Sequence, residues 1–280
     1  MPTILDKVIG TIWRSLLVGA GYAIALTIGG MIASMVGTSM PEVEDSLSSL
    51  LWSFAGGTIM ALFLGPIASS VPLSMLRHVL VWSSVILFNL VSVIIEGYYF
   101  APLLIGDSLP GLILQQILGA FITGWIITVL FTNRETATLI TLPPRSFISW
   151  SWRFAAGALS YLVFYFLFGA LNFALVTRPY YETHTGGLDV PVLSTILTAE
   201  LIRSVLIVLS ILPFFLTVRA DKKRLILLSG LILFSVGGLV PLTMQAGALP
   251  FVLLAASAVE ILFQNFSTGA VAALLLGQPK

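Results

Sequence analysis

Cysteine is absent from this sequence of 280 residues. Its absence excludes disulfides, thiolate metal sites, cysteine nucleophiles and thiol redox chemistry. Histidine is almost absent as well, because His78 and His184 are the only two, which is too few for a metal centre built from several histidines. The sequence therefore predicts neither a cofactor nor a bound metal ion.

Charged residues are scarce. They make up 9% of the chain, against 58% hydrophobic residues, whereas a soluble domain carries about 25% charged residues because water must solvate its surface. A chain this apolar cannot cover itself in water, so its outer surface must face lipid. The apolar runs are continuous rather than alternating, which favours membrane-spanning helices over a barrel. We therefore expect an all-α integral membrane protein.

Motifs for common enzyme chemistry are also missing. A serine protease within the membrane needs Ser and His at membrane depth, but both histidines lie at span boundaries, and no aspartate lies within a span to form an aspartyl protease. The H-E-x-x-H zinc motif, the P-loop and the G-x-G-x-x-G phosphate-binding loop do not occur either. We predict no catalytic residue and no enzyme activity.

Eight stretches are long and apolar enough to span a bilayer, for which a helix needs about 20 residues. They cover residues 15–37, 49–71, 78–100, 111–132, 151–176, 192–218, 225–243 and 248–276. Several contain glycine pairs, such as Gly29-Gly30 and Gly56-Gly57. Small residues let helix backbones approach closely in lipid, so these faces are predicted to point into the bundle.

Basic residues gather on one side of these spans. With the N-terminus in the cytoplasm, 11 of the 13 basic residues lie on the cytoplasmic side: Lys7, Arg14, Arg77, Arg134, Arg145, Arg153, Arg219, Lys222, Lys223, Arg224 and Lys280. The outer loops carry Arg178 and six acidic residues: Glu42, Glu44, Asp45, Asp107, Glu182 and Asp189. This asymmetry predicts a multi-pass protein of the cell membrane (plasma or inner) with both termini in the cytoplasm. Tyr180 and Tyr181 are typical of the outer interface belt.

The two halves of the sequence resemble each other. Trp13-Arg14 and Tyr22 recur as Trp152-Arg153 and Tyr161, at an offset of 139 residues. Two further pairs of segments match, at offsets of 146 and 145 residues respectively: Ser84–Asn89 with Gly230–Ser235, and Phe121–Gly124 with Phe266–Gly269. These matches predict a tandem duplication, with residues 1–141 and 147–280 as four-helix halves joined by a cytoplasmic linker at 142–146. A pseudo-two-fold axis would then run along the membrane normal. The opposing interpretation is that apolar helices resemble each other in any case.

Ionisable side chains within spans are costly, at roughly 2.5–3.5 kcal/mol each on insertion scales, so each needs a reason. Glu96, Glu200 and Glu260 lie 19 or 20 residues from a flanking cytoplasmic charge, and Gln116, the counterpart of Glu260, lies 18 residues from one. At 1.5 Å per residue they share a level about 27–30 Å from the inner charges. This level is the outer third of the bilayer.

Six residues form the candidate site, as a polar cluster with a transport or structural role: Glu96, Gln116, Glu200, Arg203, Glu260 and Gln264. Glu200 and Arg203 are spaced i,i+3 and can form an ion pair on one helix face. Two interpretations compete. In the structural one, the carboxyl groups are protonated or hydrogen-bonded between helices and fix helix register. In the functional one, they line an outward-facing vestibule that attracts cations or carries protons.

Three functions follow in order of preference. The first is a permease or transporter with an outward-facing acidic cluster, whose partner is a small cation or a proton. The second is a non-transporting scaffold, assembly factor or complex subunit, in a homo-oligomer or with a membrane partner. The third is an intramembrane enzyme that modifies lipid. The sequence contains nothing that indicates a nucleic-acid partner.

Overall fold

The computed structural model describes residues 4–41, 45–132 and 145–278. Several residues named above lie outside the described residues: Glu42, Glu44, Arg134, Lys280 and residues 142–144 of the predicted linker. The described part of the chain is helical and contains no strand. The all-α expectation is confirmed.

Eight helical segments of the described chain are long and apolar enough to cross a membrane. Their main helices are α1 (Ile4–Met35), α2 (Ser46–Ser69), α3 (Met75–Phe100), α5 (Leu109–Phe131), α6 (Phe147–Asn172), α8 (Leu193–Thr217), α9 (Lys222–Phe234) and α11 (Phe251–Leu276). The number of spans predicted from hydropathy is thus confirmed by length and composition, and the chain has the architecture of a multi-pass membrane protein.

Two spans contain a π-helical segment. In the fifth span, η2 (Phe173–Thr177) joins α6 to α7 (Arg178–Glu182), and in the seventh, η4 (Ser235–Leu239) joins α9 to α10 (Val240–Met244). The fifth span therefore ends at Glu182 instead of near residue 176. The first helix begins at Ile4 instead of near residue 15, because apolarity marks the part of a helix that suits lipid, and a helix can continue past it into polar surroundings.

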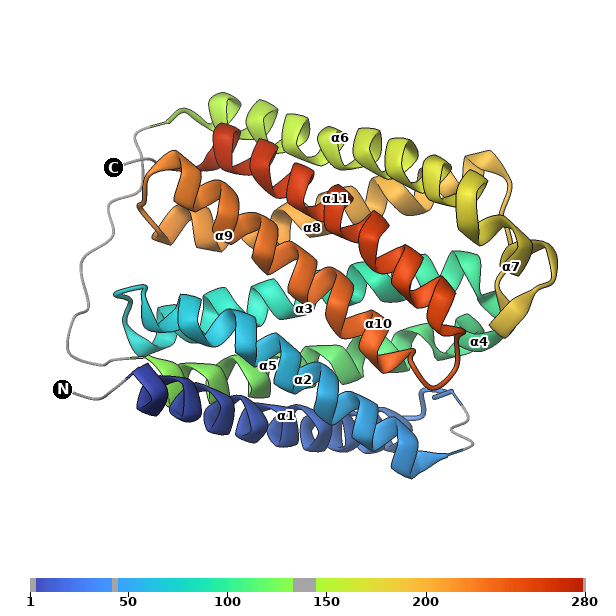
Figure 1. Ribbon diagram of the computed structural model, residues 1–280, viewed down its shortest axis with the longest axis horizontal. Helices are drawn as coiled ribbons and strands as arrows, with labels where there is room; N and C mark the ends of the chain where they lie inside the picture. Colours follow the sequence, from blue (N-terminus) through green and yellow to red (C-terminus); the bar gives the residue numbers. More distant parts are fainter. Residues whose placement is uncertain (1–3, 42–44, 133–144, 279–280) are drawn as a thin grey trace.

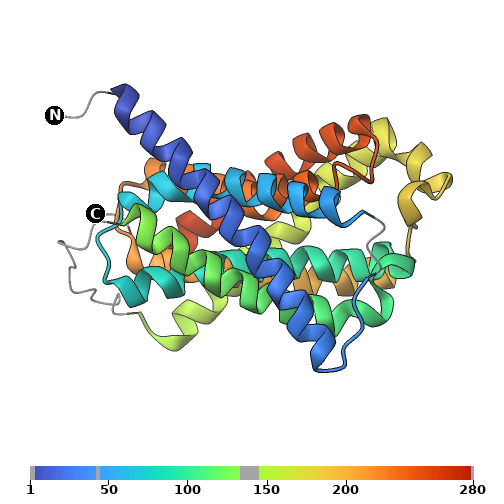
Figure 2. The same ribbon diagram turned by 90° about the horizontal axis from the view of Figure 1, so that it is seen from below.

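The helices pack in two groups that meet along a seam. In the first group α1 contacts α2 and α5, and α3 contacts α5. In the second, α6 contacts α8 and α11, and α9 contacts α11. The seam consists of α3 against α8 and of α2 against α10 and η4 (Figure 1). In Figure 2, α1 crosses α5 obliquely on the outside of the first group.

One end of the bundle carries most of the described basic residues. In Figure 1 both chain ends and the start of α9, with its Lys222-Lys223-Arg224 run, lie at this end. Arg145 and Arg153 also lie there and donate to main-chain carbonyls at the C-terminus of α11, with Arg153 Nη1 2.9 Å from the Leu275 oxygen. Cations stabilise helix C-termini because the last carbonyls there are unpaired and partly negative.

The outer surface is strongly apolar. On α6, four side chains spaced four residues apart are more than half exposed: Leu159 at 56%, Val163 at 63%, Leu167 at 57% and Leu171 at 55%. This spacing places them along one face of the helix. A continuous apolar stripe of this kind is unfavourable in water and suits contact with lipid tails.

Candidate functional site

A cavity of about 370 Å³ lies between α3 and the second helix group. Its walls include Glu96 from α3, Arg203 from α8, and Glu260 and Gln264 from α11. The cavity is also lined by connections at the end of the bundle away from the basic residues, through residues 101, 105, 188, 248 and 249. The cavity therefore reaches from the connections at that end into the helix bundle.

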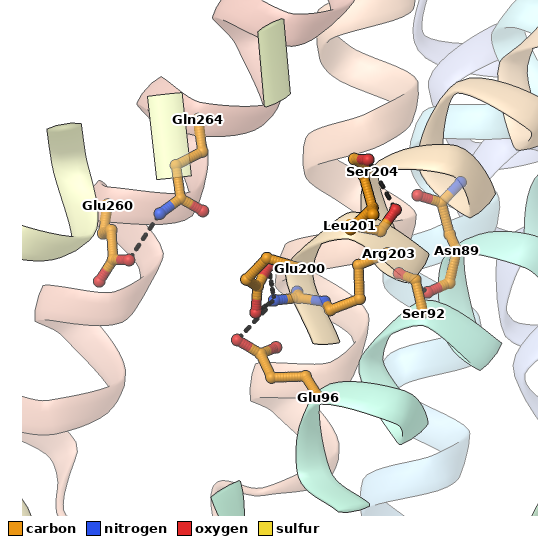
Figure 3. A network of polar contacts seen from close by, with 9 residues as sticks. All are labelled: Asn89, Ser92, Glu96, Glu200, Leu201, Arg203, Ser204, Glu260 and Gln264. Atoms are coloured by element: carbon orange, nitrogen blue, oxygen red, sulfur yellow. Dashed lines mark hydrogen bonds and ion pairs between the residues drawn. The ribbon is translucent and has the colours of Figure 1, made fainter. Parts of the chain in front are cut away.

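Arg203 forms the centre of one wall. Its Nη1 atom lies 2.7 Å from Glu96 Oε1 and 2.8 Å from each carboxylate oxygen of Glu200 (Figure 3). Glu200 is fully buried, Arg203 is 6% exposed, and the Glu96 side chain is 34% exposed. The i,i+3 ion pair expected from the sequence is present, and Glu96 extends it across the seam to α3. We call Glu96, Glu200 and Arg203 the triad.

Two aromatic rings of α6 pack against the triad. The Arg203 guanidinium carbon lies 5.7 Å from the ring centre of Tyr161 and 5.9 Å from that of Tyr165. A cation over a tyrosine face is attracted by the negative charge of the π-system, more strongly when water is excluded. Tyr161 and Tyr165 also line the cavity, as does Tyr181 of α7. α6 therefore supplies the aromatic side of the site.

Glu260 faces the triad from the other side of the cavity (Figure 3). Its carboxylate accepts two hydrogen bonds from neutral amides: Asn172 Nδ2 is 2.5 Å from Oε2, and Gln264 Nε2 is 2.6 Å from Oε1. Gly169 leaves space for the Glu260 carboxylate, since a β-carbon at position 169 would lie 3.2 Å from Glu260 Oε1. Glu260 is thus held in place without a cationic partner among the described residues.

Polar groups continue below the cavity floor. Gly237 of η4 and Asn265 of α11 line the cavity, and Asn89 of α3 lies directly behind them. Asn89 Nδ2 donates to Ser210 Oγ of α8 at 2.8 Å, while Asn89 Oδ1 accepts nothing from the described protein. A β-carbon on Gly237 would lie 2.8 Å from that oxygen. A larger residue at position 237 would therefore require the Asn89 amide to shift.

Five of the six predicted residues meet at the cavity. Glu96, Arg203, Glu260 and Gln264 line it, and Glu200 lies behind Arg203. Gln116 does not join them: it is buried beside Tyr22 in the first helix group and lines no part of the cavity. A shared depth gave no information on which side of the bundle Gln116 would face.

Sequence reasoning missed the contribution of α6. Tyr161, Tyr165, Gly169 and Asn172 are spaced by four, four and three residues and so lie on one helix face. That spacing was visible in the sequence, although it also suits ordinary packing. Tyr181, predicted as an interface residue, also lines the cavity.

The ionisable side chains of this cavity are mainly acidic. Three carboxyl groups face one guanidinium, so the fully ionised site carries an excess of two negative charges. Within the residues that the structure describes, no three His, Cys, Asp or Glu side chains are grouped to hold a metal ion. The arrangement suits binding of a cation or a proton.

Comparison with protein-family models, with curated proteins and with solved structures finds no match to this chain.

Proposed function

We propose that this chain is a permease-like membrane protein without enzyme activity, and that the acidic cavity is its substrate site. The observation that carries the proposal is the pairing of buried charges with open space. Burial of ionisable groups in a membrane span is costly and usually marks an ion or substrate path. Here the groups line a cavity of about 370 Å³, within the range of about 300–1,000 Å³ that is usual for small-molecule sites.

The proposal includes a tandem duplication with a two-fold axis along the membrane normal. Three observations support it. The contacts α1–α2, α1–α5 and α3–α5 repeat as α6–α8, α6–α11 and α9–α11. The seam contacts α3–α8 and α2–α10 exchange under such an axis. Gly124 crosses α3 at Ser83, and Gly269 crosses α9 at Ser229, at matching positions.

The proposed duplication leaves Arg203 without a charged counterpart in the first half. Helices α2 and α8 each contain an internal proline, Pro66 and Pro213, and aligning these prolines places Gly56 opposite Arg203. Gly56 packs against Val240 and Met244 in the seam. Met244 also accepts a hydrogen bond from the buried Tyr22 at 3.7 Å. At the position where the second half has the charged Arg203, the first half thus has a glycine that packs against apolar side chains.

The proposed orientation places the basic end in the cytoplasm and the cavity mouth outside. Because the chain has no native cysteine, single-cysteine variants report on one site each. We expect Lys223→Cys to be protected from a membrane-impermeant maleimide in intact cells and Asp189→Cys to be labelled. Labelling of Lys223→Cys before lysis, with Asp189→Cys protected, would reverse the orientation.

Transport is tested by flux in proteoliposomes, with a pH-sensitive dye for protons and labelled uptake for organic cations. Loss of a hydrogen bond to a charged group costs about 1.5–3 kcal/mol, so we expect Glu260→Gln to lower the flux about tenfold or more. Glu200→Gln, which alters the charge of the triad, is expected to lower it as well. Asp107→Asn, an exposed outer carboxylate outside the cavity, is the matched control. Unchanged flux in both glutamate variants would remove these residues from any transport mechanism.

A second candidate function is a non-transporting scaffold or complex subunit. The observation that favours it is the position of the triad, since the Arg203–Glu96 contact joins α8 to α3 across the seam. In that case the same substitutions would lower thermal stability or partner co-purification, and the wild-type protein would show no flux above empty liposomes.

A further inference from the structure

The cavity contains one carboxylate that is positioned but not neutralised. Arg203 contacts both Glu96 and Glu200 within 2.8 Å, so its positive charge is already shared between two carboxylates. Nothing in the triad remains to neutralise Glu260, and no cation pairs with Glu260 among the described residues. The cavity therefore offers no unpaired guanidinium to an anion, whereas the Glu260 carboxylate, when ionised, has its charge available for a cation.

Glu260 still has acceptor capacity. An ionised carboxylate has about four lone-pair sites, and the Glu260 carboxylate accepts one hydrogen bond on each oxygen, from Asn172 and from Gln264. Both donors are neutral amides, which fix the direction of the carboxylate without cancelling its charge. A ligand that carries N–H donors and a positive charge would use the sites that remain.

A second, independent observation points to a ligand. Arg203 lines the cavity and is 6% exposed, yet its Nε–H donates to no acceptor in the described protein. A buried donor without a partner is unfavourable, because it has lost its hydrogen bonds to water and gained none in return. Because the Nε atom itself is buried, the guanidinium would have to turn toward the cavity before an oxygen atom of a bound molecule could accept from it.

Much of the rest of the wall is apolar and aromatic, and Gln245, Ser257 and Asn265 add polar groups to it. Leu242, Leu249, Leu253 and Ile261 line the cavity together with Tyr181. A bare metal ion or ammonium ion would leave this surface uncovered and would need more oxygen ligands than the site groups together. A molecule with an apolar body would cover it.

We infer that the ligand of this cavity is a small organic ammonium compound with an apolar body and a nearby hydroxyl or carbonyl oxygen. Its ammonium group is held by Glu260, its apolar part lies against the leucine and isoleucine wall, and its oxygen accepts from Arg203. This inference rests on the proposed function only in taking the cavity to be a substrate site. It assigns recognition of charge to Glu260 and recognition of the ligand's oxygen to Arg203, which Glu96 and Glu200 hold in place.

The test is calorimetric titration of the purified chain in detergent with three probes of one shape. They are 2-amino-1-phenylethanol, which is cationic, 1-phenyl-1,2-ethanediol, which is neutral, and mandelate, which is anionic. All three share the ring and the benzylic hydroxyl. We expect the cation to bind at least about tenfold more tightly than the diol, because a hydrogen-bonded charge contributes more than a neutral partner. Binding of mandelate is expected to be undetectable.

Two variants locate the binding. Glu260→Gln is expected to remove the preference for the cation while leaving any binding of the diol unchanged, and Asp107→Asn is expected to leave both unchanged. If Glu260→Gln does not fold, the wild-type ranking of the three probes still decides. Equal binding of cation and diol, tighter binding of mandelate, or no binding of the cation would overturn the inference.

The outcome separates this inference from transport. Binding of the cation without flux would leave the ligand class standing and remove the permease. Flux of protons or of another solute, with no binding of the cation, would leave the permease standing and remove the ligand class.

Discussion

Replacing Arg203 by Met is expected to lower the free energy of unfolding by about 3–5 kcal/mol, the usual cost of breaking a buried ion pair from one side. The substitution leaves Glu200, which is fully buried, and Glu96 facing each other without the guanidinium that both contact. It also removes the cation that lies over the rings of Tyr161 and Tyr165. Unfolding in detergent, followed by tryptophan fluorescence, measures the effect.

The chain offers a matched control for this substitution. Arg178 and Glu182 form an ion pair of the same length, 2.7 Å, but their side chains are 64% and 58% exposed. Exposed pairs contribute only about 0–1 kcal/mol, so Arg178→Met should change stability little. Adding Glu200→Gln to Arg203→Met should restore part of the loss, because it removes a buried charge. Equal effects of the two arginine substitutions would contradict the burial argument.

Replacing Gly269 by Val is expected to destabilise the chain by about 3 kcal/mol, at the upper end of the usual cost of overpacking. A β-carbon there would lie 2.7 Å from the main-chain nitrogen of Gly230 and 2.9 Å from the carbonyl carbon of Ser229. Main-chain atoms cannot rotate away, so α9 and α11 would have to separate, and the hydrogen bond from Ser229 Oγ to the Gly269 oxygen, 2.8 Å long, would break.

Two other glycines make this prediction specific. Gly10 has no atom within 4 Å of the place that a β-carbon would take, so Gly10→Val is expected to be nearly neutral. Gly124 approaches Ser83 in the same way, with 2.8 Å to its main-chain nitrogen. Gly124→Val should therefore cost about as much as Gly269→Val. Thermal unfolding of the three variants in one detergent gives the comparison, and a neutral Gly269→Val would show that the helices are not held this closely.

Hydropathy and spacing predicted much of the fold. Continuous apolar runs identified the eight helices of the described chain that are long and apolar enough to span a membrane, because bilayer thickness dictates the length of a span. Local spacing also predicted the Glu200–Arg203 ion pair, since residues three apart share a face of a helix. Both predictions depend on a single helix at a time.

What the sequence could not predict depends on how helices face one another. Glu96 reaches Arg203 from another helix, and Asn172 reaches Glu260 across 88 positions of sequence. Gln116 was predicted at the same depth as the glutamates, but it lies in the first helix group and does not line the cavity. The π-helical segments were also missed, because an extra residue in one turn does not interrupt the apolar run of a span.

Those two segments have a consequence for how the ligand wall is built. η2 starts immediately after Asn172, and η4 contains the cavity residue Gly237. Each residue of a regular helix advances by about 100° around the axis. Deleting the extra residue of either segment would therefore rotate everything beyond it by about a quarter turn, carrying Tyr181 in one span or Leu242 in the other out of the wall. In each of these two spans, one inserted residue determines which way the side chains of the following helix, α7 or α10, face.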